Sequence, residues 1–499
     1  MIDIKSRREC FFDSFLIDEE KTTAEKRLNK PVRQDVIMVL DKPWEGMYTT
    51  FFCPVYAQGK WHLYYVTELG AQIKFICYAQ SDDGQRWTRP NLGIVEFGGS
   101  RDNNIIFDME MFKKHDFKNF DNFSVFYDDN PACPKEEKYK MIVNWMGHAT
   151  LAAFMSEDGI HWDNLTPITN EGDFDSQNRA FWSKEHNKYF CYFRGGHEAD
   201  ENVPIIDKSY TDKTAKALED PERFILREPG EGTHTFVRDV RVTESEDFVN
   251  WSKPKRINTS GTEYQLYNNV VFPYPRAPHI FVGIPLRYSE RKAWTKNYDE
   301  LCGREGRMRR MKIILRFGLA VTDSLFMSSR DGYNFTKYDE AFITPPPENP
   351  ESFVYGDGTA CPVLVEVPSK IPGADNEYMI IVRENFRAVE NPNQLVKYTI
   401  RLDGFVSLHA GGEKAKVVTK EFVYSGENLY ANMSTSARGS VYFTLKCGEE
   451  SYTSCEMFGN SVDKRIRFDD DGIVARLSGK PVILEMEMLD SDVYSVRFE

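Results

Sequence analysis

Short runs of β-branched and aromatic residues alternate with turn-forming residues along most of the chain. Examples are WHLYYV, KYKMIVNW and EYMIIVREN, and such runs are bounded by Gly, Pro, Asn or Asp. This composition is typical of β-strands, and no long amphipathic helix pattern interrupts it. The pattern therefore predicts an all-β protein.

A short turn motif recurs at nearly even spacing along the chain. Its copies are SDDGQRW, SEDGIHW, SEDFVNW, SRDGYNF and the weaker RLDGFVSL, which start at residues 81, 156, 245, 329 and 401. Asp and Gly favour a tight hairpin turn, and the aromatic residue is expected to start the next strand and pack between sheets. Because strand-like runs precede every copy, each repeat is expected to form a four-stranded antiparallel sheet.

Five such sheets close most simply into a five-bladed β-propeller, because radial closure leaves few exposed sheet edges. We expect this propeller over residues 31–405. Residues 406–499 contain short alternating strands without the turn motif, which is typical of a β-sandwich of the jelly-roll type. Residues 1–30 are expected to wrap around the outside of the propeller. The Asp and the Trp of the turn motif are predicted to be structural.

Composition and charge narrow the classes of partner. The chain has 499 residues and a formal net charge of −14, and this acidic surface argues against nucleic acid and anionic membranes as partners. No apolar segment of a secretory signal follows the first basic residues, and no run approaches the roughly 18 apolar residues of a membrane span. Nine scattered cysteines without a CxxC pair indicate reduced thiols, so we expect a cytoplasmic protein. The oligomeric state stays open.

The propeller geometry predicts where polar residues should gather. The start of each innermost strand and the end of the second strand lie at the same end of the channel, because adjacent strands are antiparallel. The polar residues at the expected starts of inner strands are Asp121, Asn122, Asp175, Gln177, Asn178, Asn268, Asn269 and Asp357. The charged residues at the expected ends of second strands include Arg194, Arg287, Arg383 and Glu384. Charges at one mouth of a narrow channel are costly unless they are paired or used. A polar plug that holds the blades in register is the structural alternative.

Several carboxylates around one pocket suit the hydrolysis of glycosidic bonds. One carboxyl group protonates the leaving oxygen, and a second attacks the anomeric carbon or activates water. We therefore predict a glycosidase with an oligosaccharide substrate, whose hydroxyl groups the amides Asn122, Gln177, Asn178 and Asn269 would bind. Retention and inversion stay open, because the sequence does not give the separation of the carboxyl groups.

Two motifs, DNFSVFYDD at 121–129 and FDSQNRAFW at 174–182, resemble the second-blade and third-blade acid motifs of five-bladed propeller glycoside hydrolases of families 32, 43, 62 and 68. The resemblance implies that Asp121 stabilises the transition state or modulates a pKa. It also implies that Asp175 is the general acid, although those families usually carry Glu there.

The first-blade Asp of those families has no counterpart in this chain, because the segment TTFF offers no carboxylate. The nearest candidate is Glu45 in DKPWEGMY, and Asp357 or Glu384 from a later blade are the alternatives for nucleophile or base. Bacterial family-32-like glycosidases are similar in DKPWEG, NLGIVEFGGSRDNNIIF, FMSSRDG and DVYSVRF. This likeness implies a carbohydrate-processing enzyme. The resemblance to the propeller families favours fructosyl or arabinosyl furanosides, and a blind channel mouth suits exo-action on short oligosaccharides.

Two other functions stay open. Arg194, Arg287 and Arg383 end equivalent strands and, with Arg238, are candidates to bind an anionic sugar such as a uronic, sialic-like or phosphorylated one, because guanidinium groups bind carboxylate and phosphate. A sialidase itself is disfavoured, because its Asp-boxes carry one more residue between Asp and Gly and its propeller has six blades. The other alternative is a non-catalytic carbohydrate-binding propeller.

A basic insertion over residues 290–312 is expected to be a solvated loop or a lid over the channel. No cofactor and no metal are predicted, since the nine histidines show no metal-ligand spacing. A structural Ca²⁺ in the acidic channel stays open.

Overall fold

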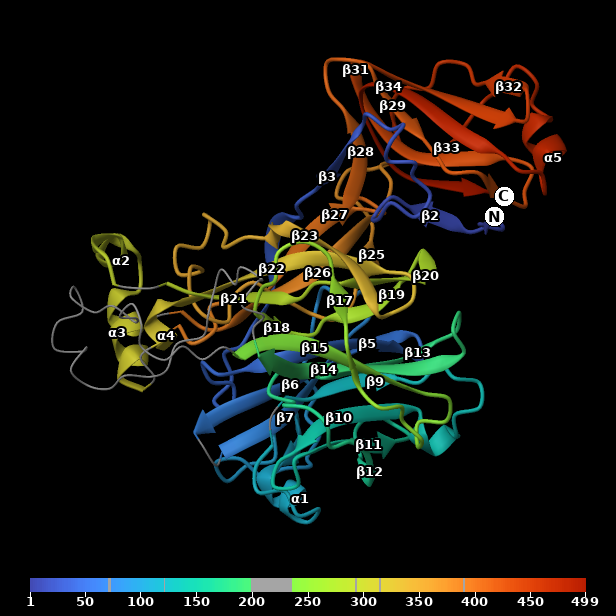
Figure 1. Cartoon of the computed structure of the whole chain (residues 1–499). Helices are drawn as coiled ribbons and strands as arrows, with labels where there is room; N and C mark the ends of the chain where they lie inside the picture. Colours follow the sequence, from blue (N-terminus) through green and yellow to red (C-terminus); the bar gives the residue numbers. More distant parts are fainter. Residues whose placement is uncertain (71–72, 121, 199–235, 292–293, 314–315, 389–390) are drawn as a thin grey trace.

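Strands dominate the protein, so the predicted all-β class is confirmed. The computed structural model describes residues 1–70, 73–120, 122–198, 236–291, 294–313, 316–388 and 391–499. Most of the chain forms a ring of sheets in a propeller arrangement, and the C-terminal strands form a separate sheet beside it (Figure 1). Among these residues, no helix is long and apolar enough to span a lipid bilayer.

The first three sheets of the ring are antiparallel units of four strands that follow chain order. The first sheet contains β5 (Thr50–Ala57), β6 (Lys60–Gly70), β7 (Ile73–Ser81) and β8 (Ile105–Asp108), and helix α1 (Met109–Lys113) follows it. The second contains β9 (Ser124–Tyr127), β10 (Tyr139–Trp145), β11 (Thr150–Ser156) and β12 (Asp163–Thr169). The third contains β13 (Arg179–Ser183), β14 (Lys188–Glu198), β15 (Phe236–Ser245) and β16 (Lys255–Arg256). Strand β9 contacts both β5 and β13, so the first strand of each unit faces the centre of the ring.

The recurring turn motif forms the same hydrogen bonds in its four clear copies. In the second copy Ser156 Oγ accepts from the Gly159 amide at 2.9 Å, and Asp158 Oδ1 accepts from the His161 amide at 2.8 Å. Burial alone would raise the pKa of Asp158, but hydrogen bonds, led by the backbone of His161, lower it to about 2. The Asp residues at the same place in the other copies are Asp83, Asp247 and Asp331. The predicted structural role of this Asp is confirmed.

The fourth sheet departs from the predicted four-stranded unit and contains seven strands. They are β17 (Asn258–Thr259), β18 (Leu266–Asn268), β19 (Val271–Tyr274), β20 (Ala277–Gly283), β21 (Leu286–Glu290), β22 (Ala320–Ser329) and β23 (Asn334–Ile343). Two expected strands are each broken in two, β18 from β19 and β20 from β21. Pro285 lies in the second break, where it has no N–H to donate to a neighbouring strand.

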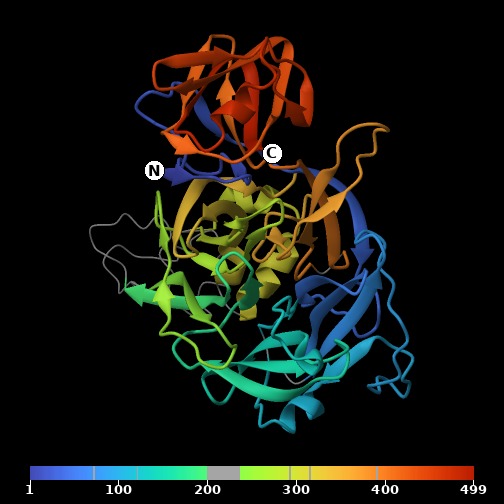
Figure 2. The same ribbon diagram turned by 90° about the vertical axis from the view of Figure 1, so that its right-hand side faces the viewer.

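The fifth sheet closes the ring with a strand from the other end of the chain. It contains β24 (Thr359–Ala360), β25 (Val365–Val367), β26 (Glu377–Glu384), β27 (Gln394–Arg401) and β4 (Val32–Val39). Strand β4 precedes the first sheet and pairs antiparallel with β27. This pairing joins both ends of the ring (Figure 2). Four sheets of the ring are thus regular units of four or five strands, instead of the five expected, and the fourth along the chain is irregular.

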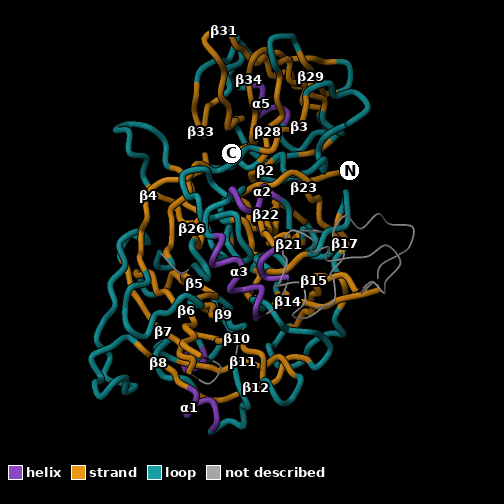
Figure 3. Tube along the Cα trace, turned by 90° about the vertical axis from the view of Figure 1, so that its left-hand side faces the viewer, coloured by secondary structure: helices purple, strands orange, loops and turns teal. Residues whose placement is uncertain are grey.

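The basic insertion before β22 forms three short helices. They are α2 (Lys296–Glu300), α3 (Arg304–Ile313) and α4 (Arg316–Leu319). They project from one face of the ring in Figure 1, and the view toward that face in Figure 3 places α3 over its centre. Arg310 on α3 donates to the carbonyl oxygen of Arg387, which follows β26, at 3.0 Å. The insertion therefore lies at one mouth of the channel.

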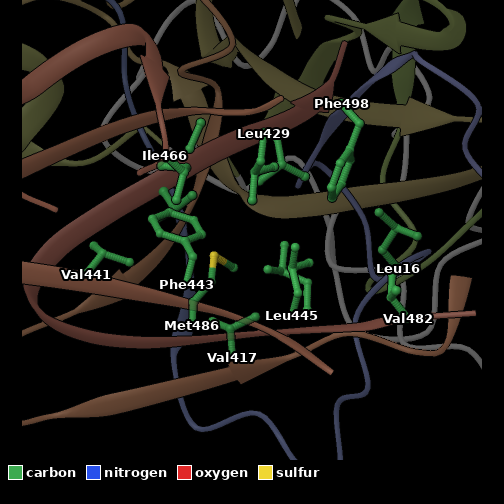
Figure 4. Packing of buried hydrophobic residues seen from close by; sticks show 14 of the residues in the cluster. Leu16, Val417, Leu429, Val441, Phe443, Leu445, Ile466, Val482, Met486 and Phe498 are labelled. Carbon is green, nitrogen blue, oxygen red and sulfur yellow. The ribbon is translucent and has the colours of Figure 1, made fainter. Parts of the chain in front are cut away.

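The C-terminal strands form one hydrogen-bonded sheet of eight strands together with N-terminal ones. The sheet contains β2 (Arg8–Cys10), β3 (Glu25–Leu28), β28 (Val406–Ala410), β29 (Ala415–Val418), β31 (Leu429–Cys447), β32 (Glu450–Thr453), β33 (Asn460–Arg465) and β34 (Ile483–Phe498). The remaining elements are β1 (Ile2–Asp3), which pairs with β30 (Phe422–Val423), and helix α5 (Ile473–Leu477). Leu16 from the N-terminal segment packs with Val417, Leu445 and Phe498 in the core of this region (Figure 4). The jelly-roll sandwich stays a prediction.

The fifth copy of the turn motif marks the junction of the two regions. Its turn leads into β28 of the C-terminal sheet, and the outer strand of the fifth sheet is β4 instead. Asp403 of this copy is buried, accepts a hydrogen bond from Arg8 at 3.1 Å and forms an ion pair with Arg276 at 3.1 Å. Phe12 packs in a core cluster of the ring. The N-terminal segment therefore contacts both regions.

Candidate active site

A cavity of about 240 Å³ lies at the channel mouth that the insertion covers. All five sheets of the ring contribute residues at or just before the start of their inner strands, and three contribute residues near the end of the second strand. The lining residues are Tyr48, Thr50, Phe51, Glu68, Asn122, Asp175, Tyr267, Asn268, Leu286, Tyr355, Gly356, Thr359, Arg383, Phe386 and Arg387. Of the predicted site residues, Asn122, Asp175 and Arg383 meet here. We call this space the axial cavity.

Asp175 presents an open carboxylate to the axial cavity from the segment before β13. Its side chain is 58% exposed, and its Oδ2 lies 2.8 Å from an Nη of Arg194. Arg194 also pairs with Asp173 and is buried. Burial alone would lower the pKa of Arg194, but the carboxylates of Asp175 and Asp173 raise it. Asp175 therefore faces a permanent cation, an arrangement that suits a carboxylate acting in its ionised form.

Glu68 is a second carboxylate in the axial cavity, and the sequence prediction of site residues missed it. It lies near the end of β6, its side chain is 32% exposed, and Oε2 lies 3.5 Å from Nζ of Lys74. Strand β6 runs antiparallel to β5, so its end lies beside the start of the inner strand. The Val-Thr-Glu ending of the predicted second strand is the sequence signal that could have identified Glu68.

Asp357 lies just beneath the cavity wall. It is buried, and its two carboxylate oxygens accept from the backbone amides of Asn385 at 3.0 Å and Phe386 at 2.8 Å. Burial raises the pKa of this carboxyl group to about 7. These hydrogen bonds hold the turn after β26, which carries Phe386 and Arg387 into the cavity wall. Asp357 therefore supports the site from below.

Two predicted catalytic carboxylates lie in buried ion pairs outside the axial cavity. Glu45 accepts from Arg89 at 2.7 and 2.9 Å and from the Tyr65 hydroxyl at 2.6 Å. Glu384 accepts from Arg33 at 2.9 and 3.0 Å and also from Asn349, Gln394 and Tyr398. Both side chains are 1% exposed or less, so neither carboxylate is open to a substrate. Asp121 lies outside the described residues.

The predicted arginines do not converge on one point. Arg287 pairs with Asp323 at 2.5 and 2.8 Å, and Arg238 donates to Gln265 at 3.0 Å. Neither lines the axial cavity. Arg238 lines a second cavity, of about 560 Å³, together with His197, Asp239 and Glu263. Arg383 is the predicted arginine that reaches the axial cavity.

Two of the three remaining predicted amides, Gln177 and Asn178, form hydrogen bonds between segments of the inner strands. Gln177 donates from its backbone to Asn268 Oδ1 and from Nε2 to Cys53 Sγ, each at 2.9 Å. Asn178 donates to the Asn122 carbonyl oxygen at 3.1 Å. Asn269 is fully buried, and its side-chain atoms have no hydrogen-bond partner within the described part of the chain. Gln177 and Asn178 thus bond to Asn268 and Asn122, two residues of the cavity lining, as expected for the polar plug considered from the sequence.

Aromatic rings form much of the cavity wall. Tyr48 and Phe386 pack edge to face with ring centroids 6.4 Å apart, and Tyr267 and Tyr355 do so at 5.7 Å. Aromatic rings in a pocket wall offer apolar contact area to a bound molecule. Within the described ranges, no cluster of three or more His, Cys, Asp or Glu residues has the geometry of a metal site. The cavity thus combines two open carboxylates with apolar rings.

No protein-family model and no curated protein matches the sequence. Similar solved structures include an N-acetylgalactosamine deacetylase from F. plautii, with 11% identity, a TM-score of 0.40, and coverage of 79% of this chain and 94% of that one. Another is a glycoside hydrolase of the GH130 family of mannoside phosphorylases, with 14% identity, a TM-score of 0.41, and coverage of 75% and 97%. A family 32 glycoside hydrolase from Bifidobacterium adolescentis has 10% identity, a TM-score of 0.37, and coverage of 95% and 82%. At these TM-scores we rest no conclusion about this chain on the likeness.

Proposed function

We propose that this protein is a glycoside hydrolase whose active site is the axial cavity. The observation that carries the proposal is the presence of two open carboxylates, Glu68 and Asp175, in one cavity that is walled by aromatic rings. Hydrolysis of a glycosidic bond needs one carboxyl group as acid and another as nucleophile or base. The buried carboxylates of the ring lie in ion pairs or accept backbone hydrogen bonds, so these two are the best candidates.

The surroundings of the two carboxylates support different roles. Asp175 faces the cation of Arg194 at 2.8 Å, which favours the ionised group that attacks the anomeric carbon or activates water. This differs from the general-acid role that the family resemblance implies for Asp175. Glu68 is then the proton donor to the leaving oxygen, and its contact with Lys74 at 3.5 Å is longer. The transition-state role of Asp121 stays as the resemblance implies it.

The small size of the cavity supports exo-action on short oligosaccharides. Its volume of about 240 Å³ is below the roughly 300–1,000 Å³ of sites for drug-sized ligands. Gln177 and Asn178 hold two of its lining residues, Asn268 and Asn122, through hydrogen bonds. A cavity of this size and shape suits the terminal sugar of a chain. Fructosyl and arabinosyl furanosides, implied by the resemblance, are the first neutral substrates to test.

Three structural interpretations accompany this function. Counting the irregular seven-stranded sheet as a blade gives a five-bladed propeller over residues 31–405, supported by the five sheets that line the cavity. A jelly-roll sandwich over residues 406–499 is supported by the single core that its long strands enclose. A reducing, cytoplasmic location is supported by the nine cysteines, all of which are free.

The proposal is tested by hydrolysis assays on a panel of short oligosaccharides with furanose, pyranose and acidic ends. The wild-type protein is compared with Asp175→Asn and with Asp173→Asn, a control that changes the other partner of Arg194. We expect release of a terminal sugar by the wild type and by Asp173→Asn only. A non-catalytic binding propeller would instead bind a panel sugar without turnover. The wild type and Asp175→Asn would then both show no hydrolysis.

A further inference from the structure

Four arginines gather at one side of the axial cavity. Arg307 and Arg310 come from α3 of the insertion, Arg383 from the end of β26, and Arg387 from the turn that follows. Arg307, Arg310 and Arg383 are buried, with 1%, 8% and 5% of their surface exposed. Arg383 and Arg387 line the cavity itself. We call these four residues the basic wall.

The buried members of the basic wall bind neutral oxygen atoms. Arg383 donates to the Gly356 carbonyl oxygen and to the hydroxyl groups of Thr50 and Thr359. Arg307 donates to a backbone carbonyl oxygen of Phe353, and Arg310 donates to that of Arg387. Within the described ranges, no carboxylate oxygen lies within 4.0 Å of the side-chain nitrogens of Arg307, Arg310 or Arg383. The Nε atoms of these three have no hydrogen-bond partner there either.

Buried charge of one sign is costly without a counter-ion. Burial lowers the pKa of Arg383 to about 10 and that of Arg310 to about 10, so both stay cationic at neutral pH. Asp357 is an acid whose charge acts on both, and its oxygens already accept hydrogen bonds from two backbone amides. One carboxyl group therefore faces the guanidinium groups of both Arg383 and Arg310, and the buried members of the wall carry excess positive charge.

The guanidinium groups of Arg383 and Arg387 stack on aromatic rings that line the cavity. The guanidinium of Arg387 lies 4.5 Å from the ring centroid of Tyr355 and 4.6 Å from that of Phe386. The guanidinium of Arg383 lies 3.8 Å from the Phe386 centroid. Stacking on rings fixes the plane of a guanidinium group.

We propose that the basic wall binds an anionic group of the substrate, a carboxylate, a phosphate or a sulfate, while Asp175 and Glu68 act on the glycosidic bond. This inference deepens the proposed glycosidase function, and it rests on that function where it treats the bound anion as part of a substrate. Anion binding itself can be measured without turnover. Guanidinium groups bind these anions through paired hydrogen bonds. Arg194 and Arg287 are not part of the wall, because carboxylates of this chain already neutralise them.

The test measures binding by calorimetry at constant ionic strength. The probes are sodium sulfate, sodium phosphate and glucuronate, with glucose and sodium chloride as neutral and salt references. The variants are Arg387→Gln and Arg310→Gln, and the control is Arg309→Gln, an exposed arginine on the same helix. We expect at least one anion to bind the wild type and Arg309→Gln equally, and each wall variant to bind it about tenfold more weakly or worse. The anion that binds best names the chemical class.

Two outcomes overturn the inference. One is that no anion binds the wild type beyond the effect of sodium chloride, and the other is that Arg387→Gln binds as well as the wild type. Arg387 is the safer variant for folding, because its side chain is only partly buried. Hydrolysis of neutral glycosides without anion binding would leave the glycosidase function standing and remove this inference. Anion binding without hydrolysis of any panel sugar would support the anion site and remove the glycosidase function.

Discussion

The charged groups on the acidic and the basic side of the axial cavity differ in their exposure and in their partners. On the acidic side, the Asp175 side chain is 58% exposed and has a cation within 2.8 Å. On the basic side, Arg383 is 5% exposed and binds neutral oxygens. An open, compensated carboxylate is placed to react, whereas a buried guanidinium without a carboxylate in hydrogen-bond contact is placed to receive a counter-ion from outside. We therefore expect the acidic side to carry out the reaction and the basic side to bind the anionic group of the substrate.

The largest expected effect on this comparison is that of Asp175→Asn. The amide cannot act as nucleophile or base, so we expect kcat to fall by about 10²–10⁴-fold. Anion binding by the basic wall should persist, and the melting temperature should change little because the side chain is half exposed. Steady-state kinetics and calorimetry on the same preparation measure both. An unchanged kcat would remove Asp175 from the chemistry.

Glu68→Gln sharpens the assignment within the acidic side. If Glu68 protonates the leaving oxygen, kcat on an oligosaccharide should fall by about 10²-fold or more. A glycoside with a 4-nitrophenyl leaving group needs little protonation, so the variant should retain most of its activity on that substrate. Equal losses on both substrates would contradict the role of acid and would make Glu68 the nucleophile or base.

Glu45→Gln tests whether a paired carboxylate acts on stability alone. The change leaves the buried cation of Arg89 without its counter-charge, and we expect the free energy of unfolding to fall by about 3 kcal/mol. Thermal and urea unfolding measure this loss. The kcat of the folded fraction should stay close to that of the wild type. Loss of kcat without loss of stability would instead bring Glu45 back as a catalytic carboxylate.

The pH dependence of sulfate binding gives the smallest effect. Burial raises the pKa of Asp357 to about 7, above its unfolded value of about 3.9. The stability contributed by its protonated form is thus present at low pH and lost as pH rises through about 7. Ionised Asp357 neutralises part of the charge on Arg383 and Arg310. Glu384 is the other acid near Asp357, and its charge raises the pKa of Asp357. Sulfate should therefore bind a few-fold more weakly at about pH 8 than at about pH 6.

Asp357→Asn is the matched variant for this pH effect. It removes the titrating group but keeps a side chain that can accept one backbone hydrogen bond. Sulfate affinity should then be the same at both pH values. A pH dependence that survives in the variant would place its origin in another group.

The fold was predictable where one local signal repeats. The turn motif with its Ser and Asp forms the same hydrogen bonds at Asp83, Asp158, Asp247 and Asp331, because these bonds depend on neighbours within six residues. The closing strand β4 was not predictable in this way, since its pairing with β27 joins residues far apart in sequence. The course of the fifth turn into β28 also depends on contacts across the fold.

The candidate site was predictable in position but not in its pairing of charges. Antiparallel geometry alone led to the strand starts that hold Asn122 and Asp175, and both line the axial cavity. Ion pairs such as Glu45 with Arg89 and Glu384 with Arg33 join residues distant in sequence, so their burial was hidden. The roles of Arg307 and Arg310 were hidden for the same reason, because α3 reaches the cavity only in the folded protein.

One measurement tests the central claim most directly. Purified wild-type protein is incubated with matched pairs of short oligosaccharides that end in a neutral sugar or in its uronic, phosphorylated or sulfated counterpart, and released sugars are quantified. We expect release of the anionic terminal sugar by the wild type, none by Asp175→Asn, and a raised KM with little change in kcat for Arg387→Gln. If the wild type releases no terminal sugar from any member of the panel, the assignment of the axial cavity as a glycosidase active site is contradicted.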